Sequence, residues 1–228
     1  MLDDHLALDL WEQAAHLAPV DRAVRTLAAI MNIDPDSAAD WPVDERDLAL
    51  IEARCDTFGP TVEFYVVCPE CSEPLETEFD LRRLLVEARQ APLPRVASSS
   101  DGDYALRAPT SREVARAARD PDPAGLMLAC LAGPGKAGEM SDLARIEASL
   151  EQAFPLLNVA IDFTCPACEA DFSRRFDAAS YLWADIERLS ETLLADVHRL
   201  ASAYGWSESE ILGMSRRRRE AYLARIAA

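Results

Sequence analysis

Two pairs of cysteines have a spacing that supports metal binding or thiol chemistry. Cys68 and Cys71 form one Cys-x-x-Cys pair, and Cys165 and Cys168 form the other. Each such turn presents two thiolates that suit two corners of a zinc tetrahedron, so two turns complete a four-coordinate site. A site closed by four sulfurs leaves the ion no open position for water. We therefore predict one structural zinc ion per chain, held by these four cysteines.

Two other interpretations of the cysteines stay open from the sequence alone. A thioredoxin-like redox site uses one Cys-x-x-Cys motif at the start of a helix, where the dipole lowers a thiol pKa. Strand-like sequence flanks both motifs here. Structural disulfides, or thiols that hold no metal, are the third possibility. The remaining cysteines, Cys55 and Cys130, stand alone in helix-like segments and are expected to be small core residues.

The two cysteine pairs lie in repeated segments. Residues 62–71 and 159–168 match at an offset of 97, and a Phe-Asp dipeptide follows each pair after seven residues, at 79–80 and 176–177. Alternating apolar residues before each pair have the period of two expected of a strand with one buried face. The seven residues after each pair suffice for a returning strand, and aspartate is a favourable helix N-cap. Each copy is therefore predicted to be a strand, a thiolate turn, a strand and a helix.

Helical periodicity and helix caps dominate the rest of the sequence. The pattern predicts helices at 20–31, 44–58, 123–131, 142–154 and 178–204, with short helices after Ser207 and Ser215. It also predicts a short strand at 104–107, followed by a capping box formed by Thr110 and Glu113. The expected fold class is α+β: mostly helical, with two zinc-ribbon-like hairpins that form a small sheet around the four-cysteine site.

The chain length of 228 residues allows one large domain or two small ones. Residues 91–102 are rich in proline and serine and form the best linker candidate. They separate residues 1–90, which contain the first hairpin, from residues 103–228, which contain the second. Because the predicted metal site takes two ligands from each part, we expect one compact unit.

The composition excludes several classes of partner. Forty acidic and 23 basic residues give a net charge of −17, a sign that repels nucleic-acid phosphates and anionic lipid headgroups. No apolar run approaches the ~20 residues of a membrane span. The first residues are acidic, unlike those of a signal peptide. We therefore expect a cytoplasmic protein that binds neither nucleic acid nor membrane.

No motif in the sequence favours an enzyme. The glycine-lysine loop at 133–138 lacks the first glycine and the Ser or Thr of a phosphate-binding loop. The three histidines, His5, His16 and His198, do not have metalloprotease spacing. We expect no catalytic residue and no small-molecule substrate.

The C-terminal tail differs in charge from the rest of the chain. Residues 216–228 hold five arginines and one glutamate, and their pattern predicts a basic amphipathic helix. The candidate partner-binding residues are Arg216, Arg217, Arg218, Arg219 and Tyr222. The alternative is that these arginines fold back onto the acidic body and serve only its stability.

Three stretches of the sequence carry a resemblance to a known family. They are residues 11–71, with the motif Phe58-Gly59-Pro60, residues 106–131, and residues 165–223, with the motif Tyr204-Gly205-Trp206. Together they resemble the baseplate assembly proteins related to the T4-type baseplate hub assembly chaperone. Contractile-tailed phages and extracellular contractile injection systems encode such proteins.

The resemblance implies a non-enzymatic role in building or occupying the baseplate of a contractile tail or injection machine. It implies protein partners near the hub and spike of that assembly. Two other classes remain as alternatives: a free-standing zinc-ribbon adaptor or regulator, and a thiol oxidoreductase.

Overall fold

Helices make up most of the described part of the protein. The computed structural model describes residues 2–90, 96–98, 105–119, 123–131 and 143–226. The helices are α1 (Asp4–Ala14), α2 (Pro19–Met31), α3 (Pro35–Ala39), α4 (Val43–Phe58), α5 (Arg82–Gln90), α6 (Ser111–Arg119), α7 (Pro123–Ala129), α8 (Leu143–Ala153), η2 (Pro155–Asn158), α9 (Ala178–Tyr204), α10 (Glu208–Leu212) and α11 (Arg216–Ile226). The strands are β1 (Thr61–Val67), β2 (Pro74–Asp80), β3 (Ala97–Ser98), β4 (Ala105–Leu106), β5 (Ala160–Thr164) and β6 (Asp171–Arg175).

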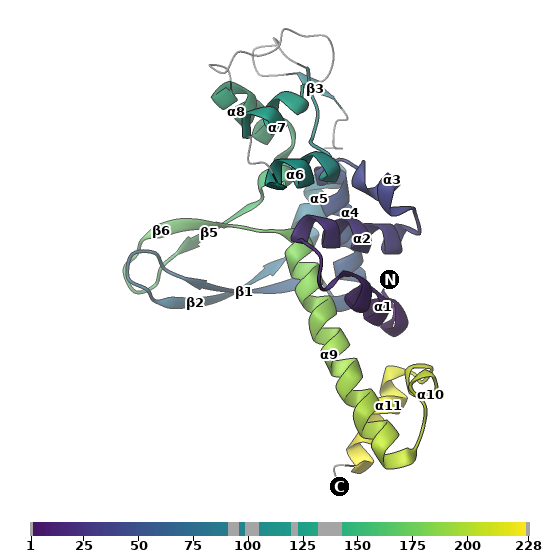
Figure 1. Ribbon diagram of the computed structural model, residues 1–228. Helices are drawn as coiled ribbons and strands as arrows, with labels where there is room; N and C mark the ends of the chain where they lie inside the picture. The colour runs from purple at the N-terminus through teal and green to yellow at the C-terminus, as the bar shows by residue number, and fades with distance from the viewer. Residues whose placement is uncertain (1, 91–95, 99–104, 120–122, 132–142, 227–228) are drawn as a thin grey trace.

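Three groups of elements project from a central helical body (Figure 1). The antiparallel hairpins β1–β2 and β5–β6 extend side by side in one direction, and we call them the hairpin arm. Helices α6, α7 and α8 lie at one end of the body, and α9 extends from the other end with α10 and α11 along its far half. The two copies of the sequence repeat therefore lie next to each other.

The central core forms where α1, α2 and α4 pack against the first half of α9. Leu50, Leu182 and Ile186 are almost fully buried there. Buried residues recur along α9 at three- and four-residue steps, and beyond Ile186 they include Leu193 and Leu200. Such a stripe is what an amphipathic helix presents to a core. The apolar stripe of α9 therefore connects the central body to the C-terminal helices.

Side-chain caps set the ends of several helices. Asp177 accepts hydrogen bonds from two backbone N–H groups at the start of α9, and Gly205, with φ of 70°, ends that helix. Ser207 and Glu210 form a capping box at the start of α10, the short helix predicted after Ser207. The predicted helix at 178–204 and its aspartate N-cap are confirmed, and helices α2, α4, α7 and α8 lie within about two residues of their predicted bounds.

The predicted fold class is confirmed, with a difference in how the hairpins meet. They form two separate two-stranded sheets instead of one small sheet. Side chains join them: the ring centroids of Phe64 in β1 and Phe163 in β5 lie 6.3 Å apart. The sequence prediction also omitted α1, which begins where the Asp3 side chain accepts a hydrogen bond from the N–H of Leu6.

Part of the predicted linker is a strand. Ala97–Ser98 forms β3 and pairs antiparallel with β4, which lies within the strand predicted at 104–107. Residues 91–95 and 99–102 of the linker lie outside the described residues, as does the glycine-lysine loop at 133–138.

A buried ion pair joins the end of α4 to α9. Arg54 Nε lies 2.8 Å from Asp185 Oδ2, and both side chains are less than one tenth exposed. Arg54 Nη1 also donates to the carbonyl of Gly59 at 2.9 Å, and Asp185 Oδ1 accepts from Arg188 at 2.8 Å. Since β1 begins two residues after Gly59, this pair fixes the root of the hairpin arm against α9.

We expect Asp185→Ala to lower the free energy of unfolding by ~3–5 kcal/mol, because it leaves Arg54 buried without its partner. The control is Glu220→Ala, which breaks an ion pair with Arg216 whose side chains are 82% and 60% exposed. That change should cost less than ~1 kcal/mol. Denaturant unfolding of both variants measures the difference, and equal losses would contradict a structural role for the buried pair.

Candidate metal centre

Each cysteine pair occupies the turn at the tip of its hairpin. In the first hairpin the N–H of Cys68 donates to the carbonyl of Glu73 at 2.9 Å, and the N–H of Ser72 donates to the carbonyl of Cys68 at 3.0 Å. The second hairpin repeats both bonds at the matching positions, each at 2.9 Å. The residue after each pair, Ser72 or Glu169, has a left-handed backbone with φ of 62° or 60°. The sequence repeat is therefore also a repeat of backbone conformation.

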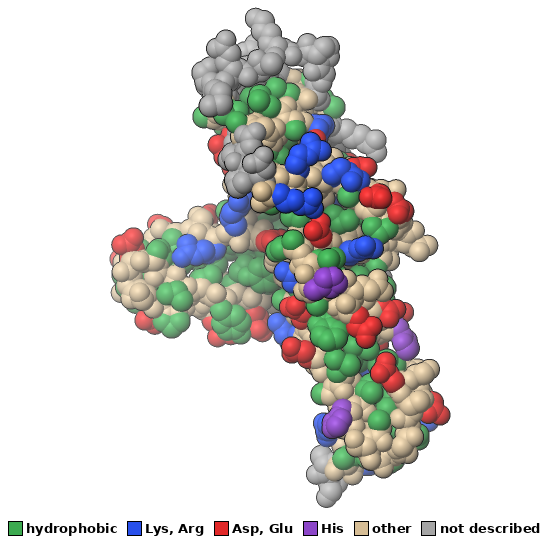
Figure 2. Space-filling view, in the orientation of Figure 1, with side chains coloured by type: hydrophobic (Ala, Val, Ile, Leu, Met, Phe, Trp, Pro, Cys, Tyr) green, Lys and Arg blue, Asp and Glu red, His purple; other side chains and the backbone are tan. Residues whose placement is uncertain are grey.

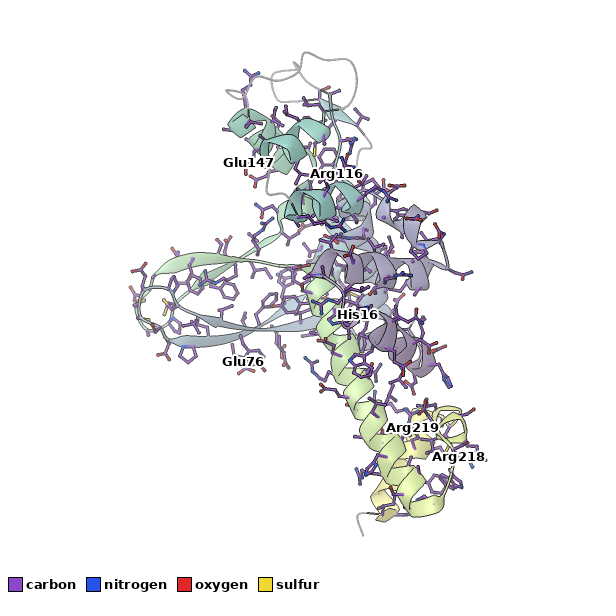
Figure 3. All side chains as sticks on the ribbon, viewed as in Figure 1. His16, Glu76, Arg116, Glu147, Arg218 and Arg219 are labelled. Atoms are coloured by element: carbon purple, nitrogen blue, oxygen red, sulfur yellow. The ribbon has the colours of Figure 1, made fainter. Side chains whose placement is uncertain are left out.

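The two turns bring four sulfur atoms together. The Sγ atoms of Cys68, Cys71, Cys165 and Cys168 all lie within 4.8 Å of one another, and Figure 3 shows sulfur at the tip of the hairpin arm. Contacts across the hairpins measure 3.7 Å from Cys68 to Cys168 and 3.5 Å from Cys71 to Cys165. Zinc–sulfur bonds of ~2.3 Å place the sulfurs of a tetrahedron ~3.8 Å apart. The cluster therefore has the size of a four-sulfur site for one metal ion.

Charge within the cluster also favours a cation. Backbone N–H groups of Cys71 and Glu70 stabilise the Cys68 thiolate and lower its pKa to about 7. At Cys71 the N–H of Glu73 acts in the same direction, but the neighbouring sulfurs, Cys168 first, outweigh it and raise the pKa to about 12. A bound dication would stabilise the thiolate form of all four cysteines, because a metal-coordinating thiol is deprotonated outright. Four thiolates are a soft donor set of the kind that zinc accepts.

An aromatic cluster holds the two hairpins together and fixes them to α9. The ring of Phe64 lies 6.3 Å from that of Phe163, 6.0 Å from that of Phe176 and 5.1 Å from that of Tyr181. Tyr181 belongs to the first turn of α9, so the cluster contains residues from both hairpins and the helix. The shared metal site predicted that the two hairpins meet, but the alternation in each strand did not show which aromatic rings pack between them.

The disulfide and thioredoxin-like interpretations of the cysteines receive no structural support. All six cysteines are free thiols, and the sulfur contacts of 3.5 and 3.7 Å run between the hairpins. Both motifs lie between strands, away from the helix N-terminus that a thioredoxin-like site uses. Burial raises the pKa of the Cys130 thiol to about 11 and also raises that of half-buried Cys55. These two thiols are apart from the cluster.

One of the residues predicted to bind a partner is paired within the chain instead of exposed. Arg219 is only 2% exposed, with its guanidinium 2.7 Å from Asp4 Oδ2 and 4.0 Å from Asp196 Oδ2. It is buried because α11 packs back onto α9, where Leu200 and Leu223 are also buried. Arg219 therefore binds the chain's own acidic residues.

The remaining candidates differ in exposure. Arg216, Arg217 and Arg218 are exposed, whereas Tyr222 is half-buried in an aromatic cluster at the far end of α9. The guanidinium of Arg218 lies 5.8 Å from the centre of the Tyr222 ring, and Arg216 pairs with Glu220. Figure 3 labels Arg218 and Arg219, which lie on the same helix. Of the five candidates, the three exposed arginines are therefore the ones accessible to another protein.

Comparison with known proteins identifies the family. A family model described as T4 bacteriophage base plate protein matches residues 18–133, just over half of the chain. The chain belongs to this family. The match includes the first cysteine pair and ends before the second hairpin. No curated protein and no solved structure matches the chain.

Membership of the base plate family confirms the coarser part of the resemblance noted above. The protein is of the phage baseplate type, whose members assemble with other baseplate proteins. Within the described residues, no helix is both long enough and apolar enough to cross a membrane.

We expect Arg219→Gln to lower the free energy of unfolding by ~2–3 kcal/mol, at or below the lower end of the ~3–5 kcal/mol range for a buried pair that loses one partner. The loss is moderated because Asp4 is 30% exposed. Arg217→Gln on the same helix removes an equal charge from an exposed position and should change stability by less than ~0.5 kcal/mol. Thermal unfolding distinguishes the two variants. Equal effects would show that the Asp4 contact does not stabilise α11.

Proposed function

We propose that this baseplate-family protein is a non-enzymatic assembly factor of the baseplate hub, with a structural zinc ion that joins its two hairpins. The observation that carries the proposal is the clustering of four sulfur atoms, from turns 97 residues apart, within 4.8 Å in a chain of this family. Cys68, Cys71, Cys165 and Cys168 would hold the ion. A closed four-sulfur site supplies a structural link and no open position for a reaction.

The shape of the protein supports an assembly role. The hairpin arm, α6 to α8, and α10 with α11 project from the body and offer separate surfaces to neighbouring proteins (Figure 1). Figure 2 shows acidic side chains along the hairpin arm and over the central helices, in keeping with the net charge of −17. We place the partners in the hub and spike, and the site of action in the cytoplasm, where thiols stay reduced.

Protein purified under reducing conditions without chelator should contain one zinc ion per chain by elemental analysis. Cys68→Ser and Cys165→Ser should lose the ion to the same degree and lower the melting temperature together, because each opens the same site. Cys55→Ser changes a thiol outside the cluster and should keep both zinc and stability. Zinc retained in either cluster variant would contradict the four-cysteine site.

The assembly role can be tested in the phage or injection system that encodes the chain. Deleting its gene should give particles without complete baseplates, as seen by electron microscopy. Complementation with the wild type or Cys55→Ser should restore them, and Cys68→Ser should not. Normal baseplates in the deletion strain would contradict the proposal. Mass spectrometry of finished particles then separates an assembly factor, expected to be absent, from a permanent component.

A further inference from the structure

The hairpin arm has an approximate two-fold symmetry that makes its two sides comparable. The repeat matches Cys68 with Cys165 and Cys71 with Cys168. Exchanging the matched residues converts the 3.7 Å contact of Cys68 with Cys168 into the 3.5 Å contact of Cys165 with Cys71. The same exchange replaces β1 by β5 and β6 by β2. The side of the arm between β1 and β6 therefore corresponds to the side between β2 and β5.

An arginine spans the side between β1 and β6. Arg174 Nη2 donates to the carbonyl of Val67 at 3.2 Å, and the guanidinium lies 5.0 Å from the centre of the Phe172 ring. The Arg174 side chain therefore links the two hairpins on this side.

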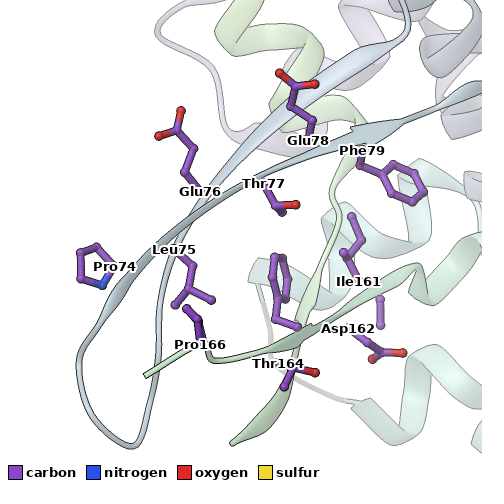
Figure 4. A pocket seen from close by; sticks show the side chains of 12 residues that line it. Pro74, Leu75, Glu76, Thr77, Glu78, Phe79, Ile161, Asp162, Thr164 and Pro166 are labelled. Carbon is purple, nitrogen blue, oxygen red and sulfur yellow. The ribbon is translucent and has the colours of Figure 1, made fainter. Parts of the chain in front are cut away.

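The side between β2 and β5 has no equivalent link. At the offset of 97, Thr77 stands in the position of Arg174, and Thr164 stands in that of Val67. Threonine is too short to make the same contact. Thr77 and Thr164 instead line a groove of about 670 Å³ between the two strands (Figure 4).

Both edges of this groove carry backbone groups without a strand partner among the described residues. In an antiparallel pair, the backbone N–H and C=O groups of one residue bond the partner strand, and those of the next residue point away from it. The bond from Cys68 to Glu73, together with the register of β1 and β2, directs the N–H and C=O groups of Glu76 and Glu78 away from β1. The matching bond in the second hairpin does the same for Asp162 and Thr164.

The walls of the groove are apolar inside and acidic outside. Leu75, Ile161 and Pro166 lie between the strands in Figure 4, whereas Glu76 and Glu78 point away from them. The successive side chains of a strand placed in the groove would point alternately into these two environments. Its inward side chains would meet apolar residues, and its outward side chains would meet carboxylates.

We propose that the groove between β2 and β5 binds an extended strand of a partner protein, with apolar and basic residues in alternation. The unpaired edges would bond the backbone of that strand, as in other cases of strand addition. The apolar floor and acidic rim would select its side chains. The proposal depends on the proposed assembly role only in stating where the partner protein comes from. Binding in the groove can be tested separately, on the purified chain.

The probe is a seven-residue peptide, the length of β2, in which valine and arginine alternate. Hydrogen exchange of the full-length protein should show added protection at the amides of Glu76, Glu78, Asp162 and Thr164. A peptide of the same composition with all valines before all arginines is the control, since it keeps the charge but loses the alternation. It should bind at least about tenfold more weakly by calorimetry.

Thr77→Arg is the decisive variant, because it places in the groove the residue type that spans the other side. It should weaken binding of the alternating peptide by at least about tenfold. Thr61→Arg adds the same charge at an exposed position of β1 and should bind normally. Both variants should keep their zinc, so loss of metal would indicate failure of the metal site and not of the groove.

Several results would overturn the proposal. These are equal binding of both peptides, unchanged binding by Thr77→Arg, protection confined to other segments, or strong protection of the same amides in the free chain. Dimerisation of the free protein that Thr77→Arg abolishes would also overturn it, because the occupant would then be a second copy.

Discussion

The meeting of four sulfur atoms at the tip of the hairpin arm is the contact on which the rest of the arm depends. A two-stranded hairpin alone is marginally stable in water, because it has no second layer to cover its apolar face. Here each hairpin provides that layer for the other, with Phe64 and Phe163 at the centre of the shared cluster. The sulfur contacts of 3.5 and 3.7 Å hold the far ends together, where the aromatic cluster no longer reaches.

The helical body sets where this arm points. Tyr181 connects the aromatic cluster to the first turn of α9, and the ion pair of Arg54 with Asp185 fixes the root of β1 against the same helix. Because α9 continues to the C-terminal helices, one long helix relates the arm to the far end of the molecule. A protein of the baseplate family built in this way presents distant surfaces in a fixed relation, which suits a role in assembly.

Local signals in the sequence were sufficient for much of this structure. The repeat around the cysteines predicted both hairpins, and Asp177 and Gly205 marked the ends of α9 because caps act within a few residues. Contacts between segments far apart in the sequence could not be predicted in this way. The amphipathic pattern of α11 did not reveal that Arg219 pairs with Asp4, near the other end of the chain. Likewise, the repeat alone did not show that Arg174 links the hairpins on one side while the equivalent Thr77 leaves the other side open.

X-ray absorption at the zinc edge of the purified protein measures how many sulfur atoms surround the ion. We expect four sulfur neighbours per zinc at ~2.3 Å and no nitrogen or oxygen ligand, because both cysteine pairs must contribute to one closed site. A shell of two sulfurs completed by nitrogen or oxygen would contradict it, since each hairpin would then hold metal by itself and the two would not be joined.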